Sequence, residues 1–330
     1  MKNDHPEIKF GKTGILLINL GTPDSTSWWD IRKYLKEFLS DRRVIEVNPL
    51  IWQIILNLFI LTLRPSKTAH AYKKIWRKDT NESPLLYFTR SQAEKLNSKI
   101  GNNKIIVDFA MRYGNPSIRS KLNSLKSLGC ENIIVLPLYP QYAAATTATV
   151  CDEVYRCLMS MRWQPSLQVI PHYESEPSYI SAIIKSIEKK VSTINWKPDL
   201  IISSYHGIPK KYFDKGDPYH CYCHKTTRLM KEKYKSINIE TTFQSRFGPQ
   251  EWLTPYTDKT LENLPKKGVK NLLVICPGFA SDCVETLEEI NIQGRESFLS
   301  QGGENFDLIP CLNHSPDHIN LFEKLVTKYI

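Results

Sequence analysis

Short apolar runs that end in Gly or Pro occur in the same order twice along the chain, and this repeat constrains the fold more than any other feature. The first set is Leu20-Gly-Thr-Pro23, Phe109-Ala-Met-Arg-Tyr-Gly114 and Asn132-Ile-Ile-Val-Leu-Pro137. The second set is His206-Gly-Ile-Pro209, Phe243-Gln-Ser-Arg-Phe-Gly248 and Asn271-Leu-Leu-Val-Ile-Cys-Pro277. Continuous β-branched runs are typical of parallel strands covered on both faces. The sequence therefore predicts an α/β fold of two similar halves, each a mainly parallel sheet flanked by helices.

The length fits this division, because 330 residues are enough for about two domains. The matching motifs are unequally spaced, with 91 residues from Gly21 to Arg112 but 39 from Gly207 to Arg246, which excludes a solenoid. We expect the boundary near Trp163, which gives halves of residues 1–163 and 164–312. Apolar residues at helical spacing near the end of the chain predict a helix within 313–330 that packs back onto the first half.

Composition excludes several classes of protein. With 41% apolar and 24% charged residues, the chain is an ordinary globular protein. The net charge of +10 favours an anionic partner, but the basic residues are dispersed and no nucleic-acid-binding motif occurs. No Gly-rich nucleotide-binding motif is present either. The eight cysteines are scattered and the first residues contain no apolar signal core, so we expect a reducing cytoplasm.

One segment, Leu50–Leu63, has 11 apolar residues out of 14 and is flanked by Pro49 and Pro65. A bilayer span needs about 20 apolar residues, so we do not expect this segment to cross a membrane. It is either a buried core helix or an exposed apolar lip that contacts lipid or a flat apolar ligand.

Chemically capable residues follow the predicted strands. In open α/β sheets, ligands bind beyond the carboxyl ends of the strands, and Arg112, Tyr139, His206 and Phe279 all fall there. His206 comes directly after an apolar strand and before a Gly/Pro turn. A lone histidine is often a structural residue, but this position favours a functional one.

Asp282, Glu285 and Glu289 are spaced to place three carboxylates on one helix face. Asp282 as N-cap with Glu285 at N3 would instead be a capping box. Capping does not explain Glu289, which a metal site or a proton-transfer role would explain. Glu288 is expected on the neighbouring face.

The segment from His220 to His224, with Cys221 and Cys223, is rich in possible metal ligands. Zinc and iron–sulfur sites usually pair cysteines as C-x₂-C, and this spacing would need two further ligands from elsewhere. The alternative is a solvated helix start.

Five ordered motifs resemble the ferrochelatase family. They are Ile18-Asn-Leu-Gly-Thr-Pro23, Tyr205-His-Gly-Ile-Pro209, Phe243-Gln-Ser-Arg-Phe-Gly248, Trp252-Leu-Thr-Pro-Tyr-Thr-Asp258 and Cys276-Pro-Gly-Phe-Ala-Ser-Asp-Cys-Val-Glu-Thr-Leu-Glu-Glu-Ile290. The resemblance runs from about Gly14 to the end of the sequence. It implies two Rossmann-like halves with a porphyrin cleft between them, and a lyase that inserts Fe²⁺ into protoporphyrin IX in the last step of haem synthesis.

Carried over by position, the resemblance implies that His206 and Glu285 are the catalytic and metal-binding residues, with Glu289 as an accessory acid. It implies porphyrin contacts from Leu20, Ser83, Arg112, Tyr113, Tyr139, Trp252, Phe279 and Asp282. Leu50–Leu63 lies where the family has its cleft lip, which predicts peripheral contact with the inner face of the membrane. We also expect a monomer in the cytoplasm.

Two departures from the family pattern bear on metals. The sequence has no C-terminal cysteine extension for a [2Fe–2S] cluster, although Cys221 and Cys223 leave an internal cluster open. Cys283 stands where relatives often have a histidine, and the row of acids ends at Gln293.

The chemistry suits these residue types. Imidazole binds Fe²⁺ and accepts protons near neutral pH, repulsion between Glu285 and Glu289 should raise one carboxyl pKa, and Arg112 suits a propionate. Which of His206 and Glu285 accepts protons and which holds metal stays open. The alternatives are a coproporphyrin or sirohydrochlorin chelatase, or a haem-binding protein that does no chemistry.

Overall fold

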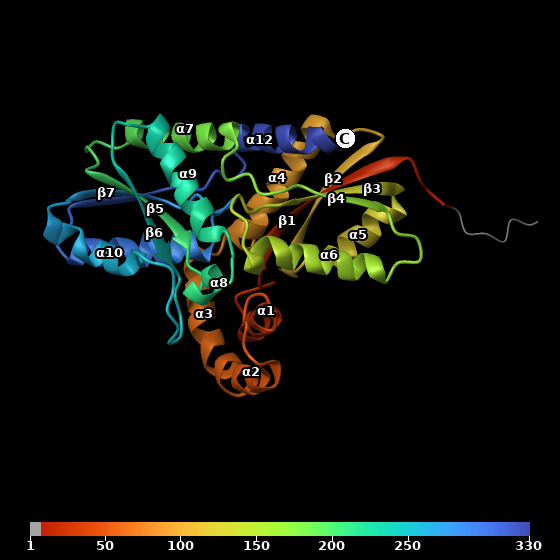
Figure 1. Cartoon of the computed structure of the whole chain (residues 1–330), viewed down its shortest axis with the longest axis horizontal. Coiled ribbons are helices and arrows are strands. Elements are labelled where there is room, and N and C mark those ends of the chain that lie inside the picture. Colours follow the sequence, from red (N-terminus) through yellow and green to blue (C-terminus); the bar gives the residue numbers. More distant parts are fainter. Residues whose placement is uncertain (1–7) are drawn as a thin grey trace, which may run out of the picture.

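A computed structural model describes residues 8–330 and shows two four-stranded, wholly parallel sheets side by side (Figure 1). The strand order is β2-β1-β3-β4 in the first sheet and β6-β5-β7-β8 in the second. The two orders are equivalent, since each sheet has its first strand between its second and third. The predicted fold class, two Rossmann-like α/β halves, is therefore confirmed.

The first half contains β1 (Lys12–Thr22), α1 (Trp28–Leu39), α2 (Pro49–Ile55), η1 (Leu56–Ile60), α3 (Leu61–Ile75), α4 (Pro84–Ile100), β2 (Ile105–Gly114), α5 (Ile118–Ser127), β3 (Cys130–Pro137), η2 (Ala144–Ala148), α6 (Thr149–Met159) and β4 (Ser166–Val169). The second contains α7 (Pro177–Thr193), β5 (Leu200–His206), α8 (Lys210–Asp214), α9 (Tyr219–Lys233), β6 (Ile239–Gln244), α10 (Thr257–Asn263), η3 (Pro265–Lys267), β7 (Asn271–Ile275), η4 (Glu285–Gly294), α11 (Arg295–Ser300), β8 (Asn305–Ile309), α12 (Pro316–Val326) and η5 (Thr327–Tyr329).

The first sheet extends beyond the predicted boundary at residue 163. β4 pairs in parallel with β3, with Ile133 opposite Leu167, so residues 166–169 belong to the first half. This strand is only four residues long and half exposed, and it therefore lacks the apolar run that marks the other strands. We propose that the boundary between the halves lies between Val169 and Pro177.

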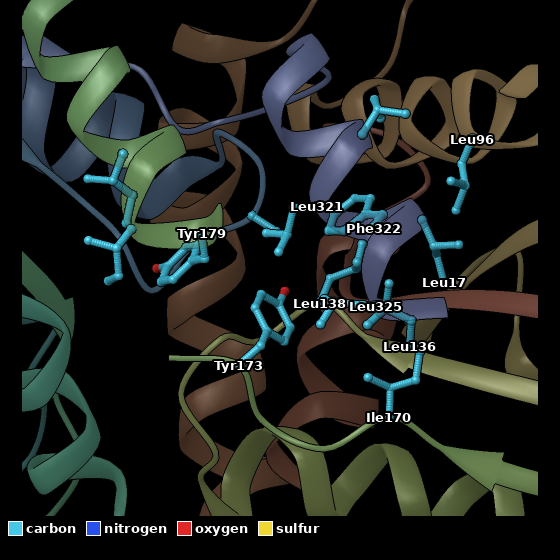
Figure 2. Close-up of a cluster of buried hydrophobic side chains, with 14 of the residues drawn as sticks. Leu17, Leu96, Leu136, Leu138, Ile170, Tyr173, Tyr179, Leu321, Phe322 and Leu325 are labelled. Atoms are coloured by element: carbon cyan, nitrogen blue, oxygen red, sulfur yellow. The ribbon is translucent and has the colours of Figure 1, made fainter. Parts of the chain in front are cut away.

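One hydrophobic core joins the two halves. It contains Leu17 and Leu136 from the first sheet, Ile201 and Leu273 from the second, and Phe322 from α12, all essentially inaccessible to solvent. Figure 2 shows Leu321, Phe322 and Leu325 of α12 pointing toward Leu17, Leu136 and Tyr179.

The terminal helix contacts both halves. α12 packs against α4 of the first half and against α7 of the second, and α7 and α12 lie along the same edge of the molecule (Figure 1). Lys99 of α4 pairs with Glu323, and Lys185 of α7 pairs with Asp317. The helix therefore bridges the halves, whereas the sequence predicted packing on the first half alone.

The apolar segment Leu50–Leu63 belongs to a longer helix than predicted. α2, η1 and α3 form one helix from Pro49 to Ile75, which continues through Pro65. By length and composition it is apolar enough to cross a membrane, but only 17% of its most apolar stretch is buried. Leu56 and Leu61 pack into a cluster with α1, whereas Leu50, Leu58 and Leu63 are 79%, 64% and 74% exposed. The helix thus projects as an apolar lip beneath the sheets (Figure 1).

Candidate functional site

His206 is the last residue of β5, at the carboxyl edge of the second sheet. Its Nδ1 lies 2.6 Å from the carbonyl oxygen of Gly207 and therefore donates to it, which leaves Nε2 as an acceptor. Gly207 is required here, because a Cβ at this position would lie 2.9 Å from the backbone oxygen of Gln244 and 3.2 Å from the Trp252 ring. The close approach of β5 and β6 thus fixes the orientation of the histidine.

Gln244 connects His206 to the acidic helix η4. It is paired with His206 in the register of β5 and β6. Its side-chain Nε2 donates to the backbone oxygen of Glu285 at 2.9 Å and to Glu289 Oε2 at 3.3 Å. The Glu289 carboxylate also accepts from the backbone N–H of Ser245 at 2.8 Å. The strand pair that carries His206 is therefore bonded to the η4 backbone at Glu285 and to the Glu289 carboxylate.

The pKa of the Glu289 carboxyl is raised, primarily by burial and further by the negative charge of Glu285. Hydrogen bonds from Ser245 and the nearby His206 act in the opposite direction without cancelling this increase. The predicted effect of repulsion between Glu285 and Glu289 thus has the expected direction, but burial is the larger cause.

Asp282 does not share a face with the two glutamates, contrary to the sequence prediction, and it forms no capping box. It lies before η4, and its own N–H donates to Asn313 Oδ1 rather than to Glu285. Its buried carboxylate accepts from Thr286 Oγ1 at 3.0 Å, from the Cys311 N–H at 3.2 Å and from Asn313 Nδ2 at 2.6 Å. Thr286 and the Cys311–Asn313 loop therefore occupy both oxygens of this carboxylate.

Glu288, expected on the neighbouring face of the helix, is a buried residue with partners of its own. Only 5% of it is exposed, and it pairs with Lys74 of α3 at 3.0 Å. Gln293 donates to its other oxygen at 2.6 Å. η4 is a π-helix, in which the Arg295 N–H reaches back to the Ile290 oxygen, and its wider turn moves residues off the faces that 3.6-residue spacing predicts. Glu288 therefore attaches η4 to the helix from Pro49 to Ile75, the lip helix.

Glu285 faces a small cavity together with four other side chains that are polar or were predicted for the site. The cavity measures about 10 Å³, room for one water molecule, and its lining includes Leu20, Tyr34, Tyr72 and Ser83. Ser83 also caps α4 by accepting from the Leu86 N–H at 3.2 Å. The structure thus brings Leu20, Ser83 and Glu285 to one place, although they are distant in sequence.

Gly21 allows the two strands beside this cavity to approach each other. It has a φ of +116°, and a Cβ there would lie 1.8 Å from the backbone oxygen of Tyr113. Tyr34 Oη donates to the Gly21 oxygen at 3.3 Å. Any side chain at residue 21 would therefore push β1 from β2 and open the cavity wall.

Arg112 and Tyr113 both contact Asp41, a residue that no sequence motif singles out. Arg112 pairs with its carboxylate at 2.5 Å and also donates to the Thr149 oxygen, and Tyr113 Oη donates to the same carboxylate at 3.0 Å. Arg112 also lines a cavity of about 500 Å³ with other charged residues of α1 and α6. The guanidinium is therefore held by protein groups in this structure.

The other residues that were predicted to contact a porphyrin lie around the carboxyl edges of the sheets. Tyr139 follows β3, is buried, and its hydroxyl finds no hydrogen-bond partner within residues 8–330. Burial raises its pKa, and the Arg112 charge lowers it by less. Trp252 is buried beside Gly207 and donates to the Phe247 oxygen at 3.0 Å. Phe279 is half-buried and packs near Cys283.

Cys221 and Cys223 do not converge. Cys221 is exposed on α9, whereas Cys223 is fully buried in an apolar cluster with Tyr205 and Tyr219. In the described part of the chain, no group of three or more His, Cys, Asp or Glu residues is arranged to hold a metal ion.

Sequence analysis missed Gln244 and Ser245, although the repeat contained a signal for them. The first-half motif has Ala110 and Met111 at the equivalent positions. Polar residues that replace apolar ones in only one copy of a repeat indicate the functional copy. Tyr34, Tyr72 and Asp41 carry no such signal, because only the tertiary fold brings them to the site.

Two solved structures share this architecture. SirB from Bacillus subtilis, solved with Fe³⁺, superposes with a TM-score of 0.59 at 12% identity and covers 96% of this chain and 95% of that one. The sirohydrochlorin chelatase SirB from Bacillus subtilis subspecies spizizenii, in complex with cobalt, gives a TM-score of 0.58 at 9% identity, covering 96% and 94%. Two parallel-sheet halves, with a histidine at a strand end facing an acidic helix, place the chain in the chelatase fold class.

Sequence comparison is more specific. The ferrochelatase family model matches residues 12–330. Ferrochelatase of Allorhizobium ampelinum is 53% identical over 331 residues, covering 99% of this chain and 96% of that protein. Ferrochelatase of Francisella tularensis subsp. novicida is 51% identical, covering 98% and 97%. The chain belongs to the ferrochelatase family.

Proposed function

We propose that this chain is a protoporphyrin ferrochelatase, a lyase that inserts Fe²⁺ into protoporphyrin IX and releases two protons. The observation that carries the proposal is that Gln244, paired with His206 in the sheet, bonds to the Glu285 backbone and to the Glu289 carboxylate, in a chain that belongs to the ferrochelatase family. Fe²⁺ and protoporphyrin are the substrates. The ion displaces two inner N–H protons of the macrocycle, so the site must accept protons as well as admit the metal.

His206 and Glu285 are the proposed catalytic pair. The Nδ1–H of His206 is occupied by the Gly207 carbonyl, so Nε2 is the atom that accepts a pyrrole proton or contacts the incoming ion. Glu285 supplies a negative charge beside the cavity. Because its carboxyl pKa is raised, Glu289 can exchange protons with this pair without contacting the porphyrin.

Porphyrin contacts are proposed for Leu20, Ser83, Tyr139, Trp252 and Phe279, which surround the carboxyl edges of the two sheets. The Tyr139 hydroxyl, which has no hydrogen-bond partner in the described part of the chain, is a proposed donor to the ligand. Arg112 and Tyr113 would bind a porphyrin propionate only if the propionate replaced the Asp41 carboxylate that both residues now contact. We assign Asp282 a positioning role, because its carboxylate is already bonded to the 311–313 loop.

Protoporphyrin fluorescence tests the reaction. Purified protein is mixed with protoporphyrin and Fe²⁺ under anaerobic conditions, and metallation is followed as loss of fluorescence. We expect turnover with protoporphyrin, slower turnover with coproporphyrin, and a loss of more than tenfold in kcat for His206→Ala, which corresponds to more than about 1.4 kcal/mol. Porphyrin binding without metallation would instead indicate a haem-binding protein, and equal activity of His206→Ala would exclude the proposed role of the histidine.

We further propose that the exposed face of Pro49–Ile75 contacts the cytoplasmic face of a membrane. The exposed side chains Leu50, Leu58 and Leu63 are apolar, and the net charge of +10 favours an anionic surface. The inner face of the same helix packs against α1, so the helix lies on the membrane rather than crossing it. A monomeric state and the lack of an iron–sulfur cluster stay predictions from the sequence.

A further inference from the structure

Two histidines on α9 lie one helical turn apart and face each other. The ring centroids of His220 and His224 are 4.4 Å apart. Residues spaced by four positions share a helix face, and two histidines at this spacing can bind the same metal ion. His224 is exposed and His220 is half-buried, so solvent ions can reach the pair.

Aromatic side chains hold both rings in place. Phe243 of β6, itself buried, stacks nearly parallel to His220 at 5.7 Å between centroids and contacts His224 at 6.0 Å. Phe213 packs edge-on against His220 at 5.1 Å. These aromatic contacts orient the two imidazoles without forming hydrogen bonds to their nitrogens.

The nitrogens of these two rings differ from those of other histidines in the chain. His172, His206 and His318 each place Nδ1 against a protein oxygen. Within residues 8–330, no such hydrogen bond holds His220 or His224. In the described part of the chain, the ring nitrogens of both histidines are therefore not taken up by a protein oxygen.

This pair is separate from the proposed catalytic site. Along β5 and β6, Tyr205 and Phe243 point toward α9, where Tyr205 Oη lies 3.0 Å from Thr227 Oγ1. Gln244 points to the opposite face, where it bonds to Glu285 and Glu289 of η4. The sheet therefore stands between the two histidines and η4.

We propose that His220 and His224 bind one divalent ion of the class that prefers imidazole, such as Zn²⁺, Co²⁺ or Fe²⁺, with water completing its coordination. No third His, Cys, Asp or Glu ligand joins them in the described part of the chain. Two protein ligands and a position at a helix N-terminus, which repels cations, give a site that exchanges its ion rather than retaining it. The proposal does not depend on the reaction proposed above.

Titration with Zn²⁺ alone, followed by calorimetry, tests the site in the full-length chain carrying His206→Ala, so that the catalytic pair does not contribute. We expect one site whose affinity falls about tenfold or more in His220→Gln and in His224→Gln. His70→Gln is the matched control, since His70 is exposed on α3 with Ser66 and Lys74 one turn away, and it should bind like the parent. Unchanged affinity in both single variants would overturn the proposal.

A second measurement follows the same His206→Ala chain by NMR, so that the catalytic pair again does not contribute. Sub-stoichiometric paramagnetic Co²⁺ should broaden two histidine ring signals in the spectrum before the others. The two signals are assigned by their loss in His220→Gln and His224→Gln. Equal broadening of all histidine signals would contradict a site at this pair.

Discussion

At the scale of single residues, the proposed chemistry depends on two carboxylates of η4 that differ in their surroundings. Glu285 faces the cavity beside Leu20, whereas Glu289 accepts hydrogen bonds from Gln244 and Ser245. A carboxylate that faces open space can act on a ligand directly, and one that is fully bonded acts through its neighbours. The two residues should therefore respond differently to the same substitution.

Glu285→Gln should lower the rate of Fe²⁺ insertion by about 10²- to 10⁴-fold, the usual size of a lost proton-transfer group. Glu289→Gln should have a milder effect, because the amide keeps part of the hydrogen bonding to Ser245. Steady-state rates measure both, with a thermal melt for each variant. Glu296→Gln, an exposed acid on α11, is the control. Equal small losses at Glu285 and Glu289 would contradict the assigned roles.

The raised pKa of Glu289 makes a prediction about stability and pH. Between its ordinary pKa and the raised folded value, the folded state holds a proton that the unfolded state has released, so stability falls as pH rises through this window. The slope is at most about 1.4 kcal/mol per pH unit. Urea unfolding from pH 4.5 upward should show that Glu289→Gln gains stability relative to the parent as pH rises. A constant difference across this range would refute a raised pKa.

At the scale of elements, strands were predictable and the acidic helix was not. The β-branched runs before Pro137 and His206 lie in β3 and β5, because strands buried on both faces need continuous apolar sequence. The positions of Asp282 and Glu288 were missed, since η4 is a π-helix and Asp282 precedes it. Pro65, which flanks the apolar segment in the sequence, lies buried inside α3 and does not end the helix. Helical faces and ends depend on tertiary contacts that residue spacing does not contain.

The Lys74–Glu288 pair joins the lip helix to η4, so its loss should lower the free energy of unfolding. Glu288→Gln removes the charge from a buried group that accepts from Lys74 and Gln293. We expect a loss of about 1–3 kcal/mol in the free energy of unfolding. Chemical denaturation measures it, and Glu296→Gln should cost less than about 0.5 kcal/mol. An equally small cost at Glu288 would mean that the pair contributes nothing to holding η4.

The lip helix makes a prediction about vesicles. Replacing Leu50, Leu58 and Leu63 with Ser should reduce sedimentation with anionic liposomes about tenfold or more, because burial of each leucine is worth roughly 1.5–3 kcal/mol. The melting temperature should stay unchanged, since these side chains face solvent. Leu61→Ser is the opposite control, because Leu61 is fully buried and its loss should lower stability. Unchanged liposome binding by the triple variant would show that the lip helix does not contact the membrane.

At the scale of the whole molecule, the repeat suggests two units, but the shared core and α12 join them. Each half has a hydrophobic cluster of its own, but Leu17, Ile201 and Phe322 belong to a further cluster that the two halves share. Thermal unfolding should therefore show a single transition by circular dichroism and by tryptophan fluorescence. Phe322→Ala should shift that transition as a whole, at a cost of about 3–5 kcal/mol. Two separated transitions would show that the halves unfold independently.

The bridging position of α12 also has a consequence during synthesis. β4 is complete at Val169, whereas Phe322 is added about 150 residues later, which takes roughly 8–30 s at 5–20 residues per second. For that time, Leu17 and Leu136 of the first half lack the side chains that will cover them. An apolar sheet face exposed on the ribosome is the kind of surface that chaperones bind. The nascent first half should therefore need their protection until the last helix emerges.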